Sequence, residues 1–394
     1  MPFVSASPQP TTPHHSQSFR FTLGKTVRAK PNRGHRKPNK RVASIFGGGG
    51  GGYDDPGSWD VSPEWWGTQG GGWGRNEGST VFEKESLHGN GLVTVTAHPA
   101  QGNPSQPQTG TSEWRVLRFN GVTRQSVNRV VQVQGSSDLS VDPNCLAFEY
   151  LKTMAVAGWL LLERGRNSEV ELCFIGGGGF TLPAFFSNLY PKSHVQSVEI
   201  DPIVIEAATS HMGISKEKNI VIEGDAVDFL PKCMNAGDQF DCICIDAFDG
   251  EDAIPGGLSD PDGSFLPSLA DALHPENGSV IINVHGGKIS PSLNPLALFK
   301  SDPGFDETSV AGKSVKKIID AFSNVVLGGN ASKGCCFTLS TAHQDNIIVV
   351  VSRGLPRTSD SKTLKEIFKD IAGKDVSRLP FDPQPRFERS LSVW

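Results

Sequence analysis

Seven short apolar runs recur in the second half of the chain, each too short for a typical helix and well suited to a buried strand. They predict strands at residues 170–175, 194–198, 219–223, 240–245, 278–284, 336–339 and 346–351. Helices are expected at 142–161, from 181, from 202, and at 265–273, 314–322 and 363–371. This alternation predicts a mainly parallel sheet. Because the last two strands are joined too closely for a helical crossover, one of them should be antiparallel.

A β-hairpin is predicted ahead of this region. Residues 114–119 and 127–133 read as strands, and Asn120-Gly121 between them is a turn dipeptide. Residues 45–110 are instead rich in glycine and tryptophan, with six consecutive glycines from Gly47 to Gly52. Glycine at this density cannot offset its ordering entropy, so residues 45–110 are predicted to be a disordered linker.

The first 53 residues contain nine Lys or Arg, no acid, and much Ser, Thr and Pro. This composition predicts a transit peptide over residues 1–44, addressed to the chloroplast stroma, without the apolar core of a secretory signal. A basic arm that binds nucleic acid is the alternative. With the hairpin at 111–142, the main domain then covers 143–355, and a C-terminal helix and tail cover 356–394.

The charge balance changes once the basic segment is set aside. Removing its nine basic residues from 37 leaves 28 against 42 acidic residues, a net charge of −14. An acidic mature protein disfavours nucleic acid and suits a basic protein partner. No apolar stretch approaches the roughly 18–20 residues that span a membrane, so no span is expected. The sequence is also compatible with a homodimer.

The predicted strand at 170–175 runs directly into four glycines, Gly176 to Gly179. Glycine lets a ligand approach the backbone closely. Thr181 is expected to cap the next helix, with Pro183 in its first turn. The following strand ends in Glu199, about 21 residues after Gly178. This is the pattern of a nucleotide-binding βαβ unit, in which the acid accepts hydrogen bonds from ribose hydroxyls.

Further acids follow the next two predicted strands, and open α/β sheets bind ligands at this edge. A dinucleotide has no use for Asp225, whereas S-adenosylmethionine uses the glycines for its methionine part, Glu199 for ribose, Asp225 for adenine N6 and Asp246 near the sulfonium. The predicted cofactor-binding residues are Gly176, Gly177, Gly178, Gly179, Glu199, Ile200, Asp225, Ala226 and Asp246. The predicted catalytic residues are Asp246 and, second, Asp249.

These motifs resemble the spermidine-synthase-like branch of class I methyltransferases. Val198-Glu199-Ile200-Asp201, Gly224-Asp225 and Asp246-Ala247-Phe248-Asp249 match it, and the glycine loop followed by Leu182-Pro183 is similar to that of methyltransferases acting on elongation factor 1-alpha. The resemblance implies a Rossmann-like seven-strand class I methyltransferase sheet in an α/β fold, preceded by a small β-hairpin and a disordered N-terminal arm.

Two departures from aminopropyltransferases affect the expected reaction. Gly179 stands where that family carries an Asp that holds the aminopropyl end, and Tyr150-Leu151-Lys152 replaces its Tyr-His-Glu. Glycine at 179 is expected to leave backbone N–H groups for a carboxylate. Lys152, if it faces the pocket, would disfavour a diammonium substrate.

The leading hypothesis is an S-adenosylmethionine-dependent methyltransferase in the plastid, acting on a protein amine or a small molecule. An aminopropyltransferase and a non-catalytic module that keeps the cofactor fold remain the alternatives. Seven cysteines include no CxxC pair, so neither a metal site nor a disulfide framework is predicted.

Overall fold

Two β-sheets organise the part of the chain that the computed structural model describes. The described residues are 78–100, 112–121, 123–132, 138–165, 169–215, 219–249, 254–285, 310–328, 333–341, 346–388 and 391–394. The predicted transit peptide and the tryptophan-rich part of the predicted linker lie outside them. No helix among these residues is long and apolar enough to cross a membrane.

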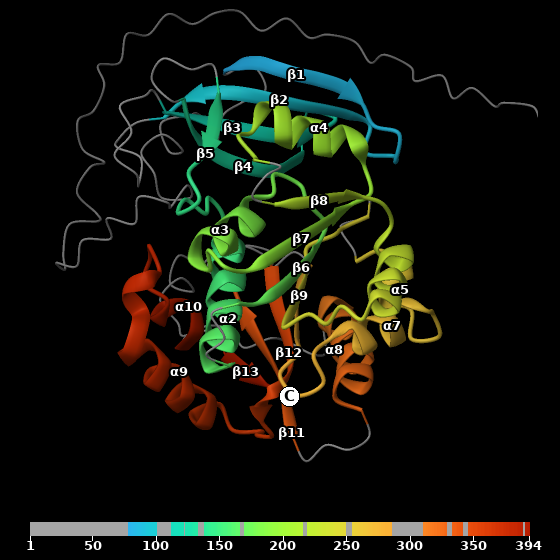
Figure 1. Cartoon of the computed structure of the whole chain (residues 1–394), viewed down its shortest axis with the longest axis vertical. Helices are drawn as coiled ribbons and strands as arrows, with labels where there is room; N and C mark the ends of the chain where they lie inside the picture. The colour runs from blue at the N-terminus through green and yellow to red at the C-terminus, as the bar shows by residue number, and fades with distance from the viewer. Residues whose placement is uncertain are drawn as a thin grey trace, which may run out of the picture. The chain divides into compact units, whose positions relative to one another are not determined.

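The larger sheet has the strand order β13-β11-β12-β10-β9-β6-β7-β8 (Figure 1). Strands β6, β7, β8, β9 and β10 are parallel, and β12 runs antiparallel to both β10 and β11. The predicted antiparallel strand is therefore β12, and the expected seven-strand sheet is confirmed. Its strands are β6 (Glu171–Ile175), β7 (His194–Glu199), β8 (Ile220–Glu223), β9 (Cys242–Ile245), β10 (Ser279–His285), β11 (Lys333–Ser340) and β12 (Asn346–Pro356), with β13 (Leu391–Val393) added at the edge.

Helices cover both faces of this sheet because side chains alternate along each strand. Leu172 and Phe174 of β6 pack with one set of helices, and Cys173 and Ile175 with the other. The first set is α2 (Glu149–Gly165), α3 (Thr181–Leu189), α9 (Ser361–Asp375) and α10 (Gln384–Glu388). The second is α5 (Ala226–Ala236), α6 (Gly256–Ser259), α7 (Phe265–Ala272) and α8 (Val310–Leu327).

The smaller sheet is antiparallel, in the order β1-β2-β3-β4-β5. Its strands are β1 (Ser79–Glu85), β2 (Leu92–Pro99), β3 (Ser112–Phe119), β4 (Thr123–Gln132) and β5 (Leu139–Val141). The predicted hairpin is β3–β4, which is confirmed. The predicted linker is wrong over 78–100, where β1 and β2 lie. Val93 and Val95 are fully buried against helix α4 (Pro202–His211), so these strands are stabilised by distant residues rather than by their own composition.

Three further predictions need correction. Helix α2 begins at Glu149, since Asp142 accepts from the Asn144 N–H (3.2 Å) in a separate turn. The predicted helix at 363–371 is confirmed as α9, but the residues after it are no tail, because Phe387 is buried in the core beside α2. The pattern also gave no helix at α5, which contains Pro231.

Candidate functional site

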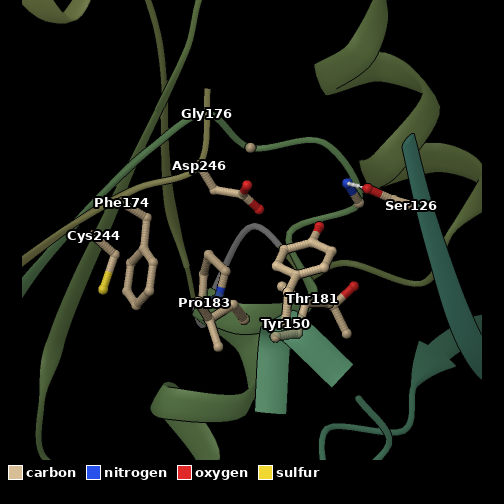
Figure 2. A pocket seen from close by; sticks show the side chains of 12 residues that line it. Ser126, Tyr150, Phe174, Gly176, Thr181, Pro183, Cys244 and Asp246 are labelled. Carbon is tan, nitrogen blue, oxygen red and sulfur yellow. Dashed lines mark hydrogen bonds between the residues drawn. The ribbon is translucent and has the colours of Figure 1, made fainter. Parts of the chain in front are cut away.

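A pocket opens where β6 and β9 end and the glycine loop begins (Figure 2). Its lining brings together residues from the small sheet, helix α2, the loop and the strand ends: Ser126, Tyr150, Leu151, Phe174, Gly176, Gly177, Gly179, Thr181, Leu182, Pro183, Cys244 and Asp246. Four of the predicted site residues, namely Gly176, Gly177, Gly179 and Asp246, therefore lie around one opening.

The glycine loop needs glycine for conformation and for space. Gly176 has φ +87°, and a Cβ there would lie 2.3 Å from the carbonyl oxygen of Asp246. Gly178 has φ +49°. Phe180 also has positive φ, and it precedes α3 without a side-chain cap. The predicted cap by Thr181 is therefore wrong, since the Thr181 hydroxyl donates to Oδ1 of Asn128 (2.5 Å) instead.

The loop N–H groups are all used within the protein. The Gly176 N–H donates to the Val198 carbonyl (3.0 Å), and those of Gly177 and Gly178 donate to one oxygen of Glu199 (2.8 and 3.3 Å). The Gly179 N–H donates to Oγ of Ser126 (2.8 Å). In the structure no N–H from Gly176 to Gly179 is left for a ligand, so the predicted direct contact with a carboxylate is wrong.

Glu199 holds the loop in place as well as ending β7. Its second carboxylate oxygen accepts from the Asp201 N–H (3.0 Å), and the side chain is nearly buried. Burial raises the pKa of Glu199, although the N–H groups of Asp201, Gly177 and Gly178 favour the anion. Asp201 instead caps α4 and accepts from Ser86 and Asn90 in the connection between β1 and β2 (2.5 and 2.8 Å). Of the two acids at the end of β7, Glu199 contacts the glycine loop, whereas Asp201 caps α4.

The other predicted cofactor residues lie outside the lining of the pocket. Asp225 is exposed and accepts from the Val227 N–H (2.9 Å) at the start of α5. Ile200 follows Glu199 and is 44% exposed. Ala226, at the start of α5, is buried in the core. Asp249 is exposed and does not line the pocket.

Asp246 is the acidic side chain that lines the pocket. Its Oδ1 accepts from Nδ2 of Asn283 (2.8 Å), and the hydroxyl of Tyr150 also donates to the carboxylate. Burial raises the pKa of Asp246, while the Asn283 and Tyr150 hydrogen bonds and the charge of His285 oppose this rise. Burial and the neighbouring carboxylate raise the pKa of Tyr150 well above its ordinary value, so it remains a donor. Asp246 is therefore a hydrogen-bonded carboxylate that faces the opening.

The small sheet contributes residues to the loop that sequence patterns did not reveal. Asn128 is fully buried and donates to the carbonyls of Gly179 and Met212 (2.8 and 3.1 Å). A Cβ at Gly179 would lie 2.7 Å from both Asn128 Oδ1 and Ser126 Cβ. Strand β4 therefore occupies the space where an Asp side chain would be needed. The polar residues that alternate along β4 were visible in the sequence, but they did not indicate that Ser126 and Asn128 contact the glycine loop.

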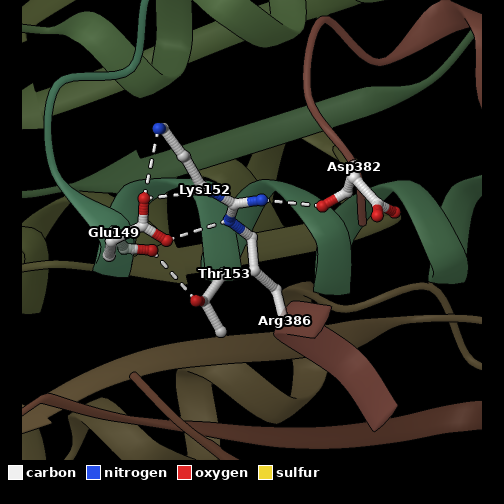
Figure 3. A network of polar contacts seen from close by, with 5 residues as sticks. All are labelled: Glu149, Lys152, Thr153, Asp382 and Arg386. Carbon is white, nitrogen blue, oxygen red and sulfur yellow. Dashed lines mark hydrogen bonds and ion pairs between the residues drawn. The ribbon is translucent and has the colours of Figure 1, made fainter. Parts of the chain in front are cut away.

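Lys152 packs away from the pocket. Its ammonium is fully buried and contacts Glu149 (3.2 Å), which also pairs with Arg386 (3.0 Å), as Figure 3 shows. Burial opposes ionisation of Glu149, but the two cations outweigh it, so the pKa of Glu149 lies below its ordinary value. The predicted repulsion of a diammonium substrate by Lys152 is therefore not supported. Glu149 joins α2 to α10 through its pair with Arg386, and Lys152 packs against Glu149 within α2.

Comparisons with known proteins agree with this architecture. No family model matches the chain. It is 33% identical over 158 residues to the human eEF1A lysine and N-terminal methyltransferase, covering 37% of this chain and 22% of that protein. It is 33% identical over 105 residues to the polyamine aminopropyltransferase of Vibrio vulnificus, covering 26% of this chain and 33% of that enzyme. The chain thus spans a third or less of these relatives.

Two solved structures overlay on the chain with low TM-scores. Human methyltransferase-like protein 13 in complex with SAH overlays with a TM-score of 0.43 at 21% identity, covering 58% of this chain and 92% of that one. Spermidine synthase from Thermotoga maritima gives 0.42 at 16%, covering 80% of each. The chain is therefore similar over part of its length to an eEF1A methyltransferase and to a polyamine aminopropyltransferase, and its mainly parallel sheet has the α/β architecture that the sequence predicted.

Proposed function

We propose that the protein transfers a methyl group from S-adenosylmethionine to an amine of a protein. The observation that carries the proposal is the Asp246 carboxylate facing a pocket walled by Gly176 and Gly177. A glycine wall admits a ligand to backbone distance, and a carboxylate there suits a cationic centre. The similarity to methyltransferases named for eEF1A supports a protein acceptor, and the net charge of −14 without the basic segment suits a basic one.

S-adenosylmethionine supplies a methyl group already activated on a sulfonium. Transfer forms a nitrogen–carbon bond as the sulfur–carbon bond breaks, with the electron pair returning to sulfur. The chain contributes mainly alignment, since in-line displacement needs the amine close to the methyl carbon. The amine must be neutral to attack, so Asp246 orients it and receives its proton. Tyr150 and Asn283 hold Asp246 toward the opening.

Ser126 gives the pocket a donor for a carboxylate. Its oxygen accepts from the Gly179 N–H, and no acceptor for its own proton is present among the described residues. The Ser126 side chain lines the pocket (Figure 2). The hydroxyl can therefore donate to the methionine carboxylate, which decarboxylated S-adenosylmethionine lacks. This favours methyl over aminopropyl transfer.

Calorimetry with the two donors tests this assignment. We expect S-adenosylmethionine to bind about 10- to 100-fold more tightly than its decarboxylated form, the range of one hydrogen bond to a charged group. Ser126→Ala should reduce that ratio while leaving affinity for the decarboxylated form within a few-fold. Ser140→Ala, which removes an exposed hydroxyl on β5, is the matched control. Tighter binding of the decarboxylated donor would favour the aminopropyltransferase alternative, and no binding of either would favour a non-catalytic module.

A further inference from the structure

Two buried asparagines form a chain of hydrogen bonds that ends at the pocket. Asn283 of β10 is 1% exposed and Asn346 of β12 is 8% exposed. Nδ2 of Asn346 donates to Oδ1 of Asn283 (2.9 Å), and Nδ2 of Asn283 donates to Oδ1 of Asp246 (2.8 Å). In the antiparallel register Asn346 pairs with His285, which places it diagonally across from Asn283. Three strands, β9, β10 and β12, thus supply one continuous chain.

The orientation of the Asn283 amide decides what Asp246 receives. An amide has one donor end and one acceptor end, and a reversed Asn283 would present its oxygen to the carboxylate. The ionised Asp246 carboxylate only accepts, so it requires the donor end of Asn283, and Asn346 reinforces this orientation by donating to the Asn283 oxygen (2.9 Å). A buried polar group without a partner is costly, so the chain is stable in one direction.

We propose that Asn283 and Asn346 are positioning residues that keep the Asp246 carboxylate anionic and aimed at the cationic centre of the donor. This inference rests on the proposed function, since it assigns Asp246 to the sulfonium. Asn283 acts by direct donation, and Asn346 acts only through Asn283.

The charge state of Asp246 also depends on the titratable groups that face it. Tyr150 approaches from α2, Cys244 precedes it on β9, and His285 follows Asn283 on β10. Tyr150 and Cys244 both have raised pKa values and stay protonated at neutral pH. His285 packs edge-on against Phe248 (ring centroids 4.4 Å apart), and its charge lowers the pKa of Asp246. A His285→Gln background therefore removes its contribution.

The pH dependence of ligand preference measures this effect without knowledge of the acceptor. S-adenosylmethionine carries a sulfonium and S-adenosylhomocysteine a neutral thioether, so an ionised Asp246 should favour the first. Protonation of Asp246 should abolish the preference as pH falls through its pKa. Removing a donor to the carboxylate raises that pKa further, so the preference should disappear at higher pH in the variant. Calorimetry of both ligands across the pH range in which the protein stays folded gives the midpoint.

We expect Asn283→Leu to move the midpoint upward by about one pH unit or more, the effect of losing a hydrogen bond to a charged group. Asn346→Leu should move it in the same direction by less. The double variant should match Asn283→Leu alone, because Asn346 has no route to Asp246 except Asn283. Asn219→Leu is the matched control: Asn219 is also buried, but it bonds Ser187 (2.9 Å) and does not line the pocket.

Each result has one meaning once the thermal unfolding of the variants shows a folded protein. An unmoved midpoint in Asn283→Leu would overturn the proposal, as would full additivity in the double variant. An equal shift in Asn219→Leu would show a general effect of losing a buried amide and would also overturn it. Failure of the unmodified protein to bind either ligand would contradict the proposed function itself, which distinguishes that failure from failure of the asparagine chain alone.

Discussion

Replacing Glu199 with alanine is expected to weaken binding of S-adenosylmethionine by about 2–4 kcal/mol, or roughly 30- to 900-fold. The loss has two sources. The carboxylate is the proposed acceptor for two ribose hydroxyls, and it also holds the N–H groups of Gly177 and Gly178 (2.8 and 3.3 Å). Without it, the loop loses its anchor beside the ligand. Calorimetry of the folded variant measures the affinity.

Glu223→Ala is the matched control for this experiment. Glu223 ends the neighbouring strand β8 directly opposite Glu199 in the parallel register, yet it is exposed. Its removal changes the net charge equally and should leave affinity within about twofold. Glu199→Gln is a further variant of similar shape. Both carboxylate oxygens of Glu199 accept from backbone N–H groups, so the N–H₂ group of the glutamine would face an N–H donor in place of an acceptor. Unchanged affinity in a folded Glu199→Ala variant would exclude Glu199 from the ribose site.

Replacing Asp246 with asparagine is expected to reduce the rate of methyl transfer by about 10²- to 10⁴-fold, the range for loss of a positioned general base. Asparagine has nearly the same shape, so the pocket should persist and S-adenosylhomocysteine should still bind. The thioether of S-adenosylhomocysteine is neutral, so its binding does not depend on a negative charge at position 246. Transfer of radiolabelled methyl groups into protein, measured with binding of S-adenosylhomocysteine, separates catalysis from folding.

Asp249→Asn provides the comparison for Asp246. Asp249 follows the same strand but is exposed and does not line the pocket. Its replacement should change the transfer rate by less than about threefold. If Asp249→Asn lost as much activity as Asp246→Asn, the assignment of the proton acceptor to Asp246 would be wrong.

The parallel strands and the glycine loop could be predicted because their signals are local. A buried strand such as β6 is apolar along its whole length, and the loop is a run of four glycines. Acids at strand ends follow from the same pattern, since parallel strands end at one edge. These features required no knowledge of which distant residues meet.

The remainder depends on contacts between residues far apart in the sequence. Val93 and Val95 form a strand because α4 covers them, and the composition around β2 did not indicate that helix. Lys152 faces Glu149 rather than the pocket because of the rotation of α2 and the position of Arg386. The amide of Asn283 appears in the sequence only as one polar residue within an apolar strand. Its role depends on its hydrogen bonds to Asp246 and Asn346, and those contacts are set by the order and register of the strands.

Parallel assays of methyl transfer and aminopropyl transfer test the central claim most directly. The unmodified protein would be incubated with methyl-labelled S-adenosylmethionine and a protein extract, and in parallel with decarboxylated S-adenosylmethionine and putrescine. The account predicts labelled methyl groups on protein amines, lost in Asp246→Asn, and no spermidine. Spermidine formation at an ordinary enzymatic rate, on the order of one per second, with no labelled protein would contradict it.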